Sequence, residues 1–429
     1  MNQPTTLQPR FAALKNRNFT LLWSGMIVSN VGTWMQNVAQ SWLMLQLTNS
    51  PFWLGLLGLS FALPMIILPL VGGVVADRVD RIRLLYVTQT GQLLTALALA
   101  ILFWSGHISV WAILITSFIN SALLAFDNPS RQALIPDLVP PQHLMNAISL
   151  NSASYTGAAL IGPALAGVLL APLGAGALFF INAVSYLAVI FALIGVKDVR
   201  RHSGVEQHER PGKAMLSGLS YAWRDHFILA LLGLSALAAV FGRSYQNLLP
   251  VFARDIWKGG EVGYGILLAA AGGGAVVGAF WLASFRHMKQ QGAIMIASGL
   301  VFSLCLILFA ISPSLLLGGI LLFIGGVAST VYGTMITTFL QVSVPNQVRG
   351  RLMSLYAITF IGLPSLGALG SGSLAQALGG LQGAPRAVLI GGALVGIVLL
   401  SVATLFWKRE ITPGGSARVA IELSLNKEP

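Results

Sequence analysis

Arg243 is the residue whose type and position most directly suggest chemistry with a solute. It lies well inside the apolar segment 227–252, which is long enough to cross a membrane. A charge at that depth costs at least about 2.5–3.5 kcal/mol unless a partner offsets it. Two interpretations remain open. Arg243 binds an anionic group of a substrate, such as a carboxylate or a catecholate, or it reaches the outer surface or pairs with Asp255 or Glu261.

Uncharged polar and aromatic side chains lie inside several other apolar segments. Polar groups cost free energy in lipid, so they face the interior of a helix bundle or a water-filled cavity. Each amide alone fits helix packing as well as it fits substrate contact. Taken together, with tryptophan and tyrosine among them, they predict a site for an amphipathic or aromatic ligand. These residues are Asn30, Trp34, Asn37, Asn120, Tyr245, Gln246 and Tyr332.

The composition indicates which elements must position these side chains. Charged residues make up 9% of the 429 residues and apolar residues 55%, whereas an ordinary soluble domain carries roughly 25% charged residues. So few charges exclude a soluble multi-domain enzyme, and the apolar content excludes a disordered chain. A protein with several membrane spans remains, since a helix needs about 20 apolar residues to cross the hydrocarbon.

Twelve apolar segments of suitable length follow one another along the chain. The first is too long for the apolar core of a signal peptide, so we expect it to be an uncleaved span. Six segments precede a polar, highly charged stretch and six follow it. The predicted spans are 19–46, 51–76, 82–104, 110–127, 144–170, 176–196, 227–252, 261–284, 291–311, 315–340, 352–376 and 387–407.

This order predicts two lobes, 19–196 and 226–407, joined by the loop 197–225 and flanked by the tails 1–18 and 408–429. If the N-terminus lies inside and the spans alternate, 21 of the 25 lysines and arginines fall on the cytoplasmic side. Because cytoplasmic loops carry an excess of these residues, both termini are predicted to be cytoplasmic. The net charge of +12 therefore marks a membrane face rather than a surface for nucleic acid.

The two halves resemble each other at an offset of about 205 residues. The segment Pro140–Leu150 aligns with Pro345–Leu355, and Gly162 aligns with Gly367. A common offset indicates that a six-helix unit was duplicated. Such a duplication is the architecture of a two-lobed transporter whose binding site lies between the lobes.

The loop between the second and third spans contains an ordered set of small and charged residues, Gly73, Asp77, Arg78, Arg81 and Arg83. Their order and spacing resemble the signature loop of the major facilitator superfamily, although an aspartate and an isoleucine depart from its pattern. Positive-inside charge explains the arginines but not an aspartate at the membrane boundary. The resemblance implies a central cavity lined by the first, fourth, seventh and tenth spans, which hold the polar residues named above. It also implies a cytoplasmic latch between the lobes, formed by Asp77, Arg81 and Asp127.

Two further motifs resemble those of exporters. The segment Phe126–Pro140 is similar to one in enterobactin-type siderophore exporters and macrolide efflux proteins, whereas a simple Asx-Pro turn accounts only for its first residues. Gly162, Pro163 and Gly167 in the fifth span resemble an antiporter motif in which two other glycines are here alanine. Small residues let helices approach, and a proline bends its helix. The motif therefore predicts either a seal at the lobe interface or ordinary close packing.

The acidic residues bear on energy coupling. None lies in the middle of a predicted span, and those nearest to spans sit at their edges, namely Asp77, Asp127, Asp255 and Glu261. The family resemblance implies proton coupling, a task that suits a buried carboxyl. Asp127 is the first candidate for that carboxyl and Asp255 the second.

No feature of the sequence points to catalysis. The chain lacks a phosphate-binding loop for ATP, a histidine or cysteine cluster with metal-ligand spacing, and a nucleophile–base pair. Its single cysteine, Cys305, lies in an apolar segment. We therefore expect no cofactor, no metal ion, no catalytic residue and no enzymatic activity.

These observations predict an all-α membrane protein with twelve transmembrane helices in two pseudo-symmetric six-helix lobes, the major facilitator fold. We expect a monomeric secondary active transporter in a bacterial inner membrane, with the lipid bilayer and a small-molecule substrate as its partners and no nucleic acid. By alternating access it would export amphipathic compounds such as siderophores, drugs or metabolites, with protons as the candidate coupling ion. An uptake facilitator of the same fold is the first alternative. A non-transporting receptor or a membrane-embedded enzyme is the second.

Overall fold

The computed structural model consists of helices joined by short connections, and its described residues contain no strand. In the first half, each long helix begins within two residues of a predicted span. These helices are α1 (Arg17–Thr48), α2 (Pro51–Ile67), α4 (Arg81–Trp104), α5 (Val110–Leu138) and α6 (Leu144–Gly195). The residues described are 11–68, 79–196, 220, 223–284, 290–344, 348–349, 352–353, 355–356, 359 and 362–408.

Helix α5 is longer than the sequence suggests. The polar stretch from Asp127 to Arg131 predicts that the fourth span ends at residue 127, but α5 continues to Leu138. The helix continues past the predicted end of the span, and there Asp127 and Arg131, one helical turn apart, form an ion pair that balances both charges. The Ser130 hydroxyl also donates to the Phe126 carbonyl at 2.8 Å within the same turn. Asp127 therefore lies inside a helix and not at its edge.

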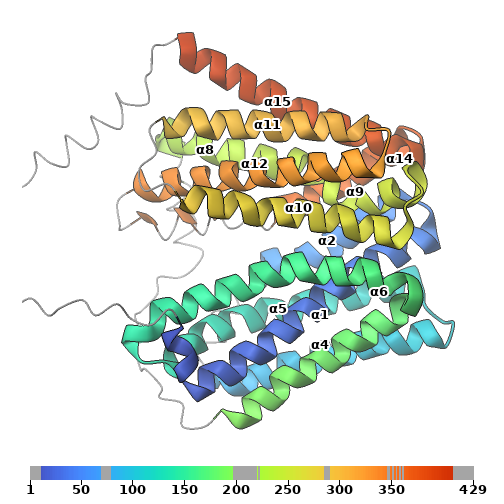
Figure 1. Ribbon diagram of the computed structural model, residues 1–429, viewed down its shortest axis with the longest axis vertical. Coiled ribbons are helices and arrows are strands. Elements are labelled where there is room, and N and C mark those ends of the chain that lie inside the picture. Colours follow the sequence, from blue (N-terminus) through green and yellow to red (C-terminus); the bar gives the residue numbers. More distant parts are fainter. Residues whose placement is uncertain are drawn as a thin grey trace, which may run out of the picture. The chain divides into compact units, whose positions relative to one another are not determined.

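Helix α6 contains the fifth and sixth predicted spans in one continuous run. At Gly174 the backbone takes φ 75° and ψ 169°, so the helical dihedrals are interrupted there. Glycine adopts a positive φ readily because it has no Cβ. Figure 1 shows the two arms of α6 meeting at this bend.

The second half contains a broken helix where the seventh span is predicted. It consists of α8 (His226–Leu237), the π-helical turn η3 (Ala238–Gly242), α9 (Tyr245–Val251) and a second π-helical turn, η4 (Phe252–Ile256). Turns of this type are rare in proteins, and many of those that occur lie at functional sites. The later helices are α10 (Gly260–Ala283), α11 (Gln291–Ala310), α12 (Leu315–Val342), α14 (Leu363–Ala377) and α15 (Ala384–Lys408).

The chain divides into two compact units. Unit 1 contains Met1–Pro211 together with Gly260–Ala269, the start of α10, and unit 2 contains Gly212–Gly259 together with Ala270–Pro429. In unit 1, α1, α4, α5 and α6 lie side by side (Figure 1). In unit 2, α11 packs against both α12 and α15.

Each unit has its own apolar core. In unit 1 the core includes Phe19 of α1, Leu85 of α4 and Leu134 of α5, all almost fully buried. In unit 2 it includes Met335 of α12 and Leu399 of α15. Buried contacts of this kind fix the positions of the helices that carry the polar side chains.

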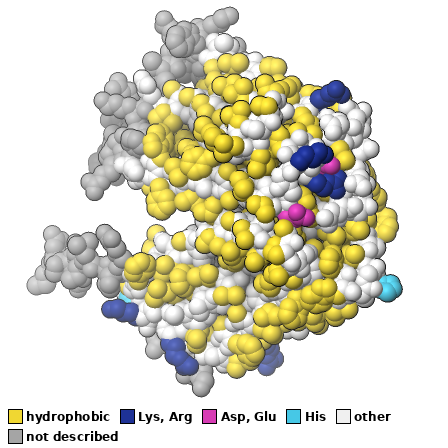
Figure 2. Space-filling view, turned by 45° about the vertical axis from the view of Figure 1, so that its right-hand side comes forward, with side chains coloured by type: hydrophobic (Ala, Val, Ile, Leu, Met, Phe, Trp, Pro, Cys, Tyr) yellow, Lys and Arg dark blue, Asp and Glu magenta, His cyan; other side chains and the backbone are white. Residues whose placement is uncertain are grey.

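The outer surfaces of the helices are apolar. Among the described residues, eight helices are long and apolar enough to cross a membrane, with α6 counted once. Large side chains such as Ile101, Val168 and Phe191 are exposed on them, and hydrophobic side chains are spread widely over the face shown in Figure 2. An exposed apolar surface of this extent is typical of contact with lipid.

The internal repeat predicted from the sequence has a structural counterpart. Gly162 of α6 lies against the backbone of α1 at Val31, and Gly367 of α14 lies against the backbone of η3 at Val240. At both places a Cβ would collide with or press on a carbonyl oxygen of the neighbouring segment. In each half, a glycine at the equivalent position lets the fifth span of that half approach the first.

Candidate functional site

A polar buried site in unit 1 surrounds Asp127 of α5, whose side chain has no exposed surface. The hydroxyl of Thr88 and the amide nitrogen of Gln89, both on α4, donate to the same carboxylate oxygen, Oδ1, at 2.8 Å each. Two neighbouring residues of one helix thus hold the carboxylate of another. The contacts tie α4 to α5 at this level.

Arg131 completes this site from one turn further along α5. Its Nε forms an ion pair with Oδ2 of Asp127, and its side chain is only 9% exposed. Removing two charges from water costs several kcal/mol per ion, which mutual attraction and hydrogen bonds must offset. Each of these two charges therefore depends on the other for its burial.

A second ion pair joins the start of α4 to the end of α5. The Nη1 atom of Arg81 donates to Asp137 Oδ2 at 2.7 Å and to the Ala133 carbonyl at 2.9 Å. The Asp80 carboxylate caps α4 by accepting from the backbone N–H groups of Ile82 and Arg83. The start of α4 is thus fixed within unit 1.

These contacts locate part of the predicted signature loop. Arg81 pairs with Asp137 and Asp127 pairs with Arg131, so the two residues expected in one network have separate partners here. The Arg83 side chain is exposed. Gly73, Asp77 and Arg78 lie outside the described residues, and the latch that would include them stays a prediction.

The span-five motif lies at close helix contacts in unit 1. A Cβ at Gly162 would come 2.5 Å from the Trp34 Cβ and 3.0 Å from the Val31 oxygen of α1. A Cβ at Gly167 would come 2.5 Å from the Gly265 Cα at the start of α10. Pro163 is buried between them. The small residues permit these approaches, as the packing interpretation requires.

The predicted cavity residues of unit 1 differ in exposure. Asn30, Trp34 and Asn37 are half-buried on α1, whereas Asn120 of α5 is 6% exposed. The Trp34 ring meets the Tyr155 ring of α6 edge to face, with centroids 6.3 Å apart. Tyr155 is a residue that the sequence did not single out.

In unit 2 the predicted cavity residues divide in the same way. Arg243 follows η3 and is half-buried, and Gln246 is exposed. Tyr245 is buried, with its ring edge-on to Phe302 and Phe309. The Tyr332 hydroxyl donates to the Leu234 carbonyl at 3.1 Å within the core of unit 2. Substrate contact by these residues stays a prediction, and the half-buried and exposed ones are the better placed for it.

The acids considered as partners of Arg243 have the following neighbours. The Arg254 Nε donates to Asp255 Oδ2 at 3.0 Å. The Glu261 carboxylate accepts from the indole N–H of Trp42 at 3.1 Å, within unit 1. Both acids therefore have a donor of their own.

One amide network in unit 1 serves helix packing. The Asn182 amide of α6 donates to Gln36 Oε1 of α1 at 2.8 Å, and both side chains are almost fully buried. Tyr186 of α6 and Thr33 of α1 share a hydroxyl contact of 3.2 Å nearby. For Gln36 the structure favours helix packing, one of the two roles that amides can have within a membrane.

Four residues that contact Asp127 or Arg81 were not among the site residues predicted from the sequence, namely Thr88, Gln89, Arg131 and Asp137. The four-residue spacing of Asp127 and Arg131 is the signal that identifies the ion pair on a helix. Nothing local in the sequence marks Thr88 and Gln89, because their partner lies on another helix.

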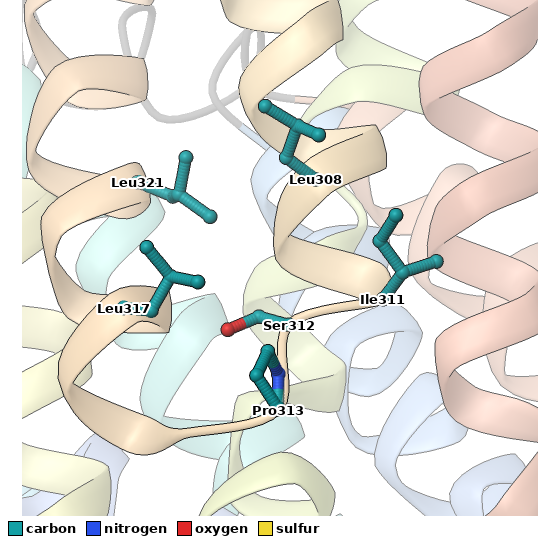
Figure 3. Close-up of a pocket in the computed structure, with 6 residues that line it drawn as sticks. All are labelled: Leu308, Ile311, Ser312, Pro313, Leu317 and Leu321. Carbon is teal, nitrogen blue, oxygen red and sulfur yellow. The ribbon is translucent and has the colours of Figure 1, made fainter.

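A small pocket of about 240 Å³ lies where α11 and α12 join in unit 2. Figure 3 shows that its lining is almost entirely apolar, with only a serine hydroxyl among Leu308, Ile311, Ser312, Pro313, Leu317 and Leu321. Sites for small polar ligands need a few convergent polar groups. We therefore do not place the substrate in this pocket. The described residues also contain no group of three or more metal-ligating side chains.

The comparisons with known proteins agree on one family. The family model for transmembrane secretion effectors matches residues 8–416. The chain is 26% identical to a staphyloferrin A transporter of Staphylococcus aureus over 329 residues, which cover 76% of this chain and 81% of that protein. It is 25% identical to an enterobactin exporter of Shigella boydii over 368 residues, 83% of this chain and 86% of that one.

Solved structures share the fold at low sequence identity. A bacterial homologue of the human lysosomal transporter Spinster, in an inward-facing and unoccupied conformation, matches with a TM-score of 0.71 at 16% identity, covering 94% of this chain and 97% of that chain. A nucleoside transporter matches with a TM-score of 0.70 at 14% identity, covering 91% and 99%. The predicted all-α, two-lobed membrane fold is confirmed.

Proposed function

We propose an export function for this chain, which belongs to the transmembrane secretion effector family of major facilitator transporters. It is a multi-pass membrane transporter of small molecules and not an enzyme. The proposed substrates are small amphipathic compounds that carry an anionic group, moved by alternating access. The observation that carries the proposal is the half-exposure of Asn30, Trp34 and Asn37 in the middle third of α1.

Half-exposed amides at that depth need a polar environment. Helix α1 extends over 32 residues, enough to cross the hydrocarbon with a margin at each end. Amides exposed to lipid there would lose their hydrogen bonds to water without compensation. We therefore infer that this part of α1 faces water and substrate. The same surface offers an indole ring for the apolar part of a ligand.

Arg243 supports an anionic substrate. It follows the π-helical turn η3 near the middle of the seventh span and remains half-buried. A guanidinium suits carboxylate or phosphate groups because it presents several N–H donors in one plane. The named relatives support siderophore-like compounds as a class to test, since one is a transporter of staphyloferrin A and another an exporter of enterobactin.

We expect transport to run outward and to depend on a proton gradient. Cells that lack the protein should accumulate the substrate, and inverted vesicles that contain it should take the substrate up. Collapsing the proton gradient should stop that uptake, because the chain carries no ATP-binding loop. The candidate proton-carrying groups are Asp127 and then Asp255. Accumulation in intact cells instead would favour the uptake facilitator, and full-rate uptake without a gradient would remove proton coupling.

The variant Arg243→Ala should lower export of anionic compounds by about tenfold or more, because hydrogen bonds to a charged group contribute about 1.5–3 kcal/mol. Export of uncharged compounds should change little. Initial uptake rates in inverted vesicles measure both. Arg386→Ala is the matched control, because Arg386 is an exposed arginine at the start of α15 that donates to the Leu378 carbonyl. Equal rates for wild type and Arg243→Ala on every anion would rule out the proposed role of Arg243.

A further inference from the structure

The residues along one side of α6 are exposed near the start of the helix and buried further along it, within unit 1. Three- and four-residue steps connect Ser149, Ser152, Thr156, Leu160, Pro163 and Gly167, which therefore lie on the same side of the helix. The side chains of Ser149, Ser152 and Thr156 are exposed, whereas Pro163 and Gly167 are buried. Gly167 lies against Gly265 at the start of α10, which covers this end of the line.

Further along the same helix, the exposed side chains are aliphatic. Ile161, Leu165 and Val168 are 50%, 41% and 63% exposed, and all three are apolar. Their positions fall on the side of α6 opposite to the line of hydroxyls. Exposed hydroxyl groups at 149–156, beside the exposed Met145 and Ile148, suit a surface that meets water, whereas the aliphatic groups at 161–168 suit a surface that meets lipid.

An aromatic pair lies beside the exposed hydroxyls. Tyr155 is 59% exposed, and its ring meets the half-buried ring of Trp34 edge to face at an interplanar angle of 63°. Gly162 leaves room for Trp34, because a Cβ there would come 2.5 Å from the Trp34 Cβ. The indole ring thus lies against an exposed phenol ring.

The Thr156 hydroxyl next to Tyr155 can accept a hydrogen bond. The Thr156 hydroxyl donates to the Ser152 carbonyl at 3.0 Å, and this bond leaves the lone pairs of its oxygen to accept from a ligand donor. A ring that bears hydroxyl groups could thus meet Tyr155 with its face or edge and donate to Thr156. We call Trp34, Ser152, Tyr155 and Thr156 together the Tyr155 surface.

We propose that the Tyr155 surface binds the hydroxylated aromatic ring of the exported substrate. The inference rests on the proposed export function and narrows its substrates to anionic compounds with such a ring. The ring and the anionic group of a test compound can be varied separately.

Cysteine labelling tests the surface without relying on transport. Ser152→Cys and, as lipid-facing control, Val168→Cys are placed in a Cys305→Ala background and treated with a membrane-impermeant thiol reagent in inverted vesicles. Ser152→Cys should react and Val168→Cys should not. Added 2-hydroxybenzoate should slow the reaction of Ser152→Cys, whereas its saturated analogue 2-hydroxycyclohexanecarboxylate, with the same charge, should not.

The role of the ring is tested by adding Tyr155→Ala or Tyr155→Phe to the Ser152→Cys protein. An aromatic contact contributes about three- to tenfold in affinity, so Tyr155→Ala should raise the 2-hydroxybenzoate concentration for half-protection by that factor. Tyr155→Phe should preserve protection, as should Phe191→Ala, which removes an exposed ring on the second arm of α6, beyond Gly174. An unreactive Ser152→Cys, or equal protection by the two compounds, would overturn the proposal.

Transport and protection measured in the same vesicles distinguish a failure of this inference from a failure of the proposed function. Intact export of an anionic substrate without ring-specific protection would leave the export function standing and refute the Tyr155 surface. Ring-specific protection without transport of any compound would retain the binding surface and refute the export function.

Discussion

Asp127→Asn should destabilise unit 1 by about 3–5 kcal/mol, the usual cost of leaving one member of a buried ion pair without its partner. Asparagine has nearly the same shape and can still accept from Thr88 and Gln89. The variant therefore removes mainly the charge opposite Arg131, whose side chain is 9% exposed. The midpoint of thermal unfolding in mild detergent, followed by the amount of monodisperse protein, measures the loss.

Two companion variants distinguish charge balance from general damage. Asp127→Asn combined with Arg131→Met should recover most of the lost stability, because no uncompensated charge remains. Asp137→Asn should cost less than Asp127→Asn, since the Arg81 side chain of that pair is 29% exposed and can be solvated. If Asp127→Asn melts like the wild type, the burial of Arg131 does not depend on the charge of Asp127.

Gly367→Ala should destabilise unit 2 by about 3 kcal/mol, the upper part of the range for overpacking. Gly367 lies on α14, and an added methyl group would collide with the Val240 carbonyl oxygen of η3. A backbone oxygen within a π-helical turn has no rotamer through which to move away. The two helical segments would have to separate, and η3 also lies against Gly391 of α15, where a Cβ would come 2.6 Å from the Phe241 oxygen.

Gly370→Ala is the matched control for this prediction, because it lies three residues further on the same helix and has no atom within 4 Å of an added Cβ. It should leave the unfolding midpoint unchanged or raise it slightly, since alanine favours the helix more than glycine does. Equal unfolding midpoints for Gly367→Ala and Gly370→Ala would show that α14 does not contact η3 this closely.

The helices could be predicted from the sequence because every residue of a long apolar run adds to the same hydropathy signal. A run of about 20 apolar residues is unambiguous, and predicted helix starts such as 51 and 110 are the observed ones. The end of α5 could not be found in this way. Asp127, Pro129 and Arg131 together have the composition of a loop, and only their mutual ion pair and the partners on α4 keep them helical and buried.

The site was predictable by residue type but not by partner. The family resemblance implied one charge network of Asp77, Arg81 and Asp127, whereas Arg81 pairs with Asp137 and Asp127 pairs with Arg131. Their partners depend on how α4 and α5 pack, which no local pattern encodes. Tyr155 was missed for a similar reason. Its sequence neighbours are ordinary for a membrane helix, and its importance comes from Trp34, which lies more than a hundred residues earlier in the chain.

The bend at Gly174 makes α6 a helical hairpin with almost no connecting segment. The fifth and sixth spans are therefore expected to enter the bilayer together, because no polar loop separates them that would allow one span to insert before the other. Affinity tags or protease sites should be tolerated poorly at this point, unlike insertions in a long surface loop. Any residue other than glycine at position 174 would have to adopt a positive φ, so the hairpin depends on this single glycine.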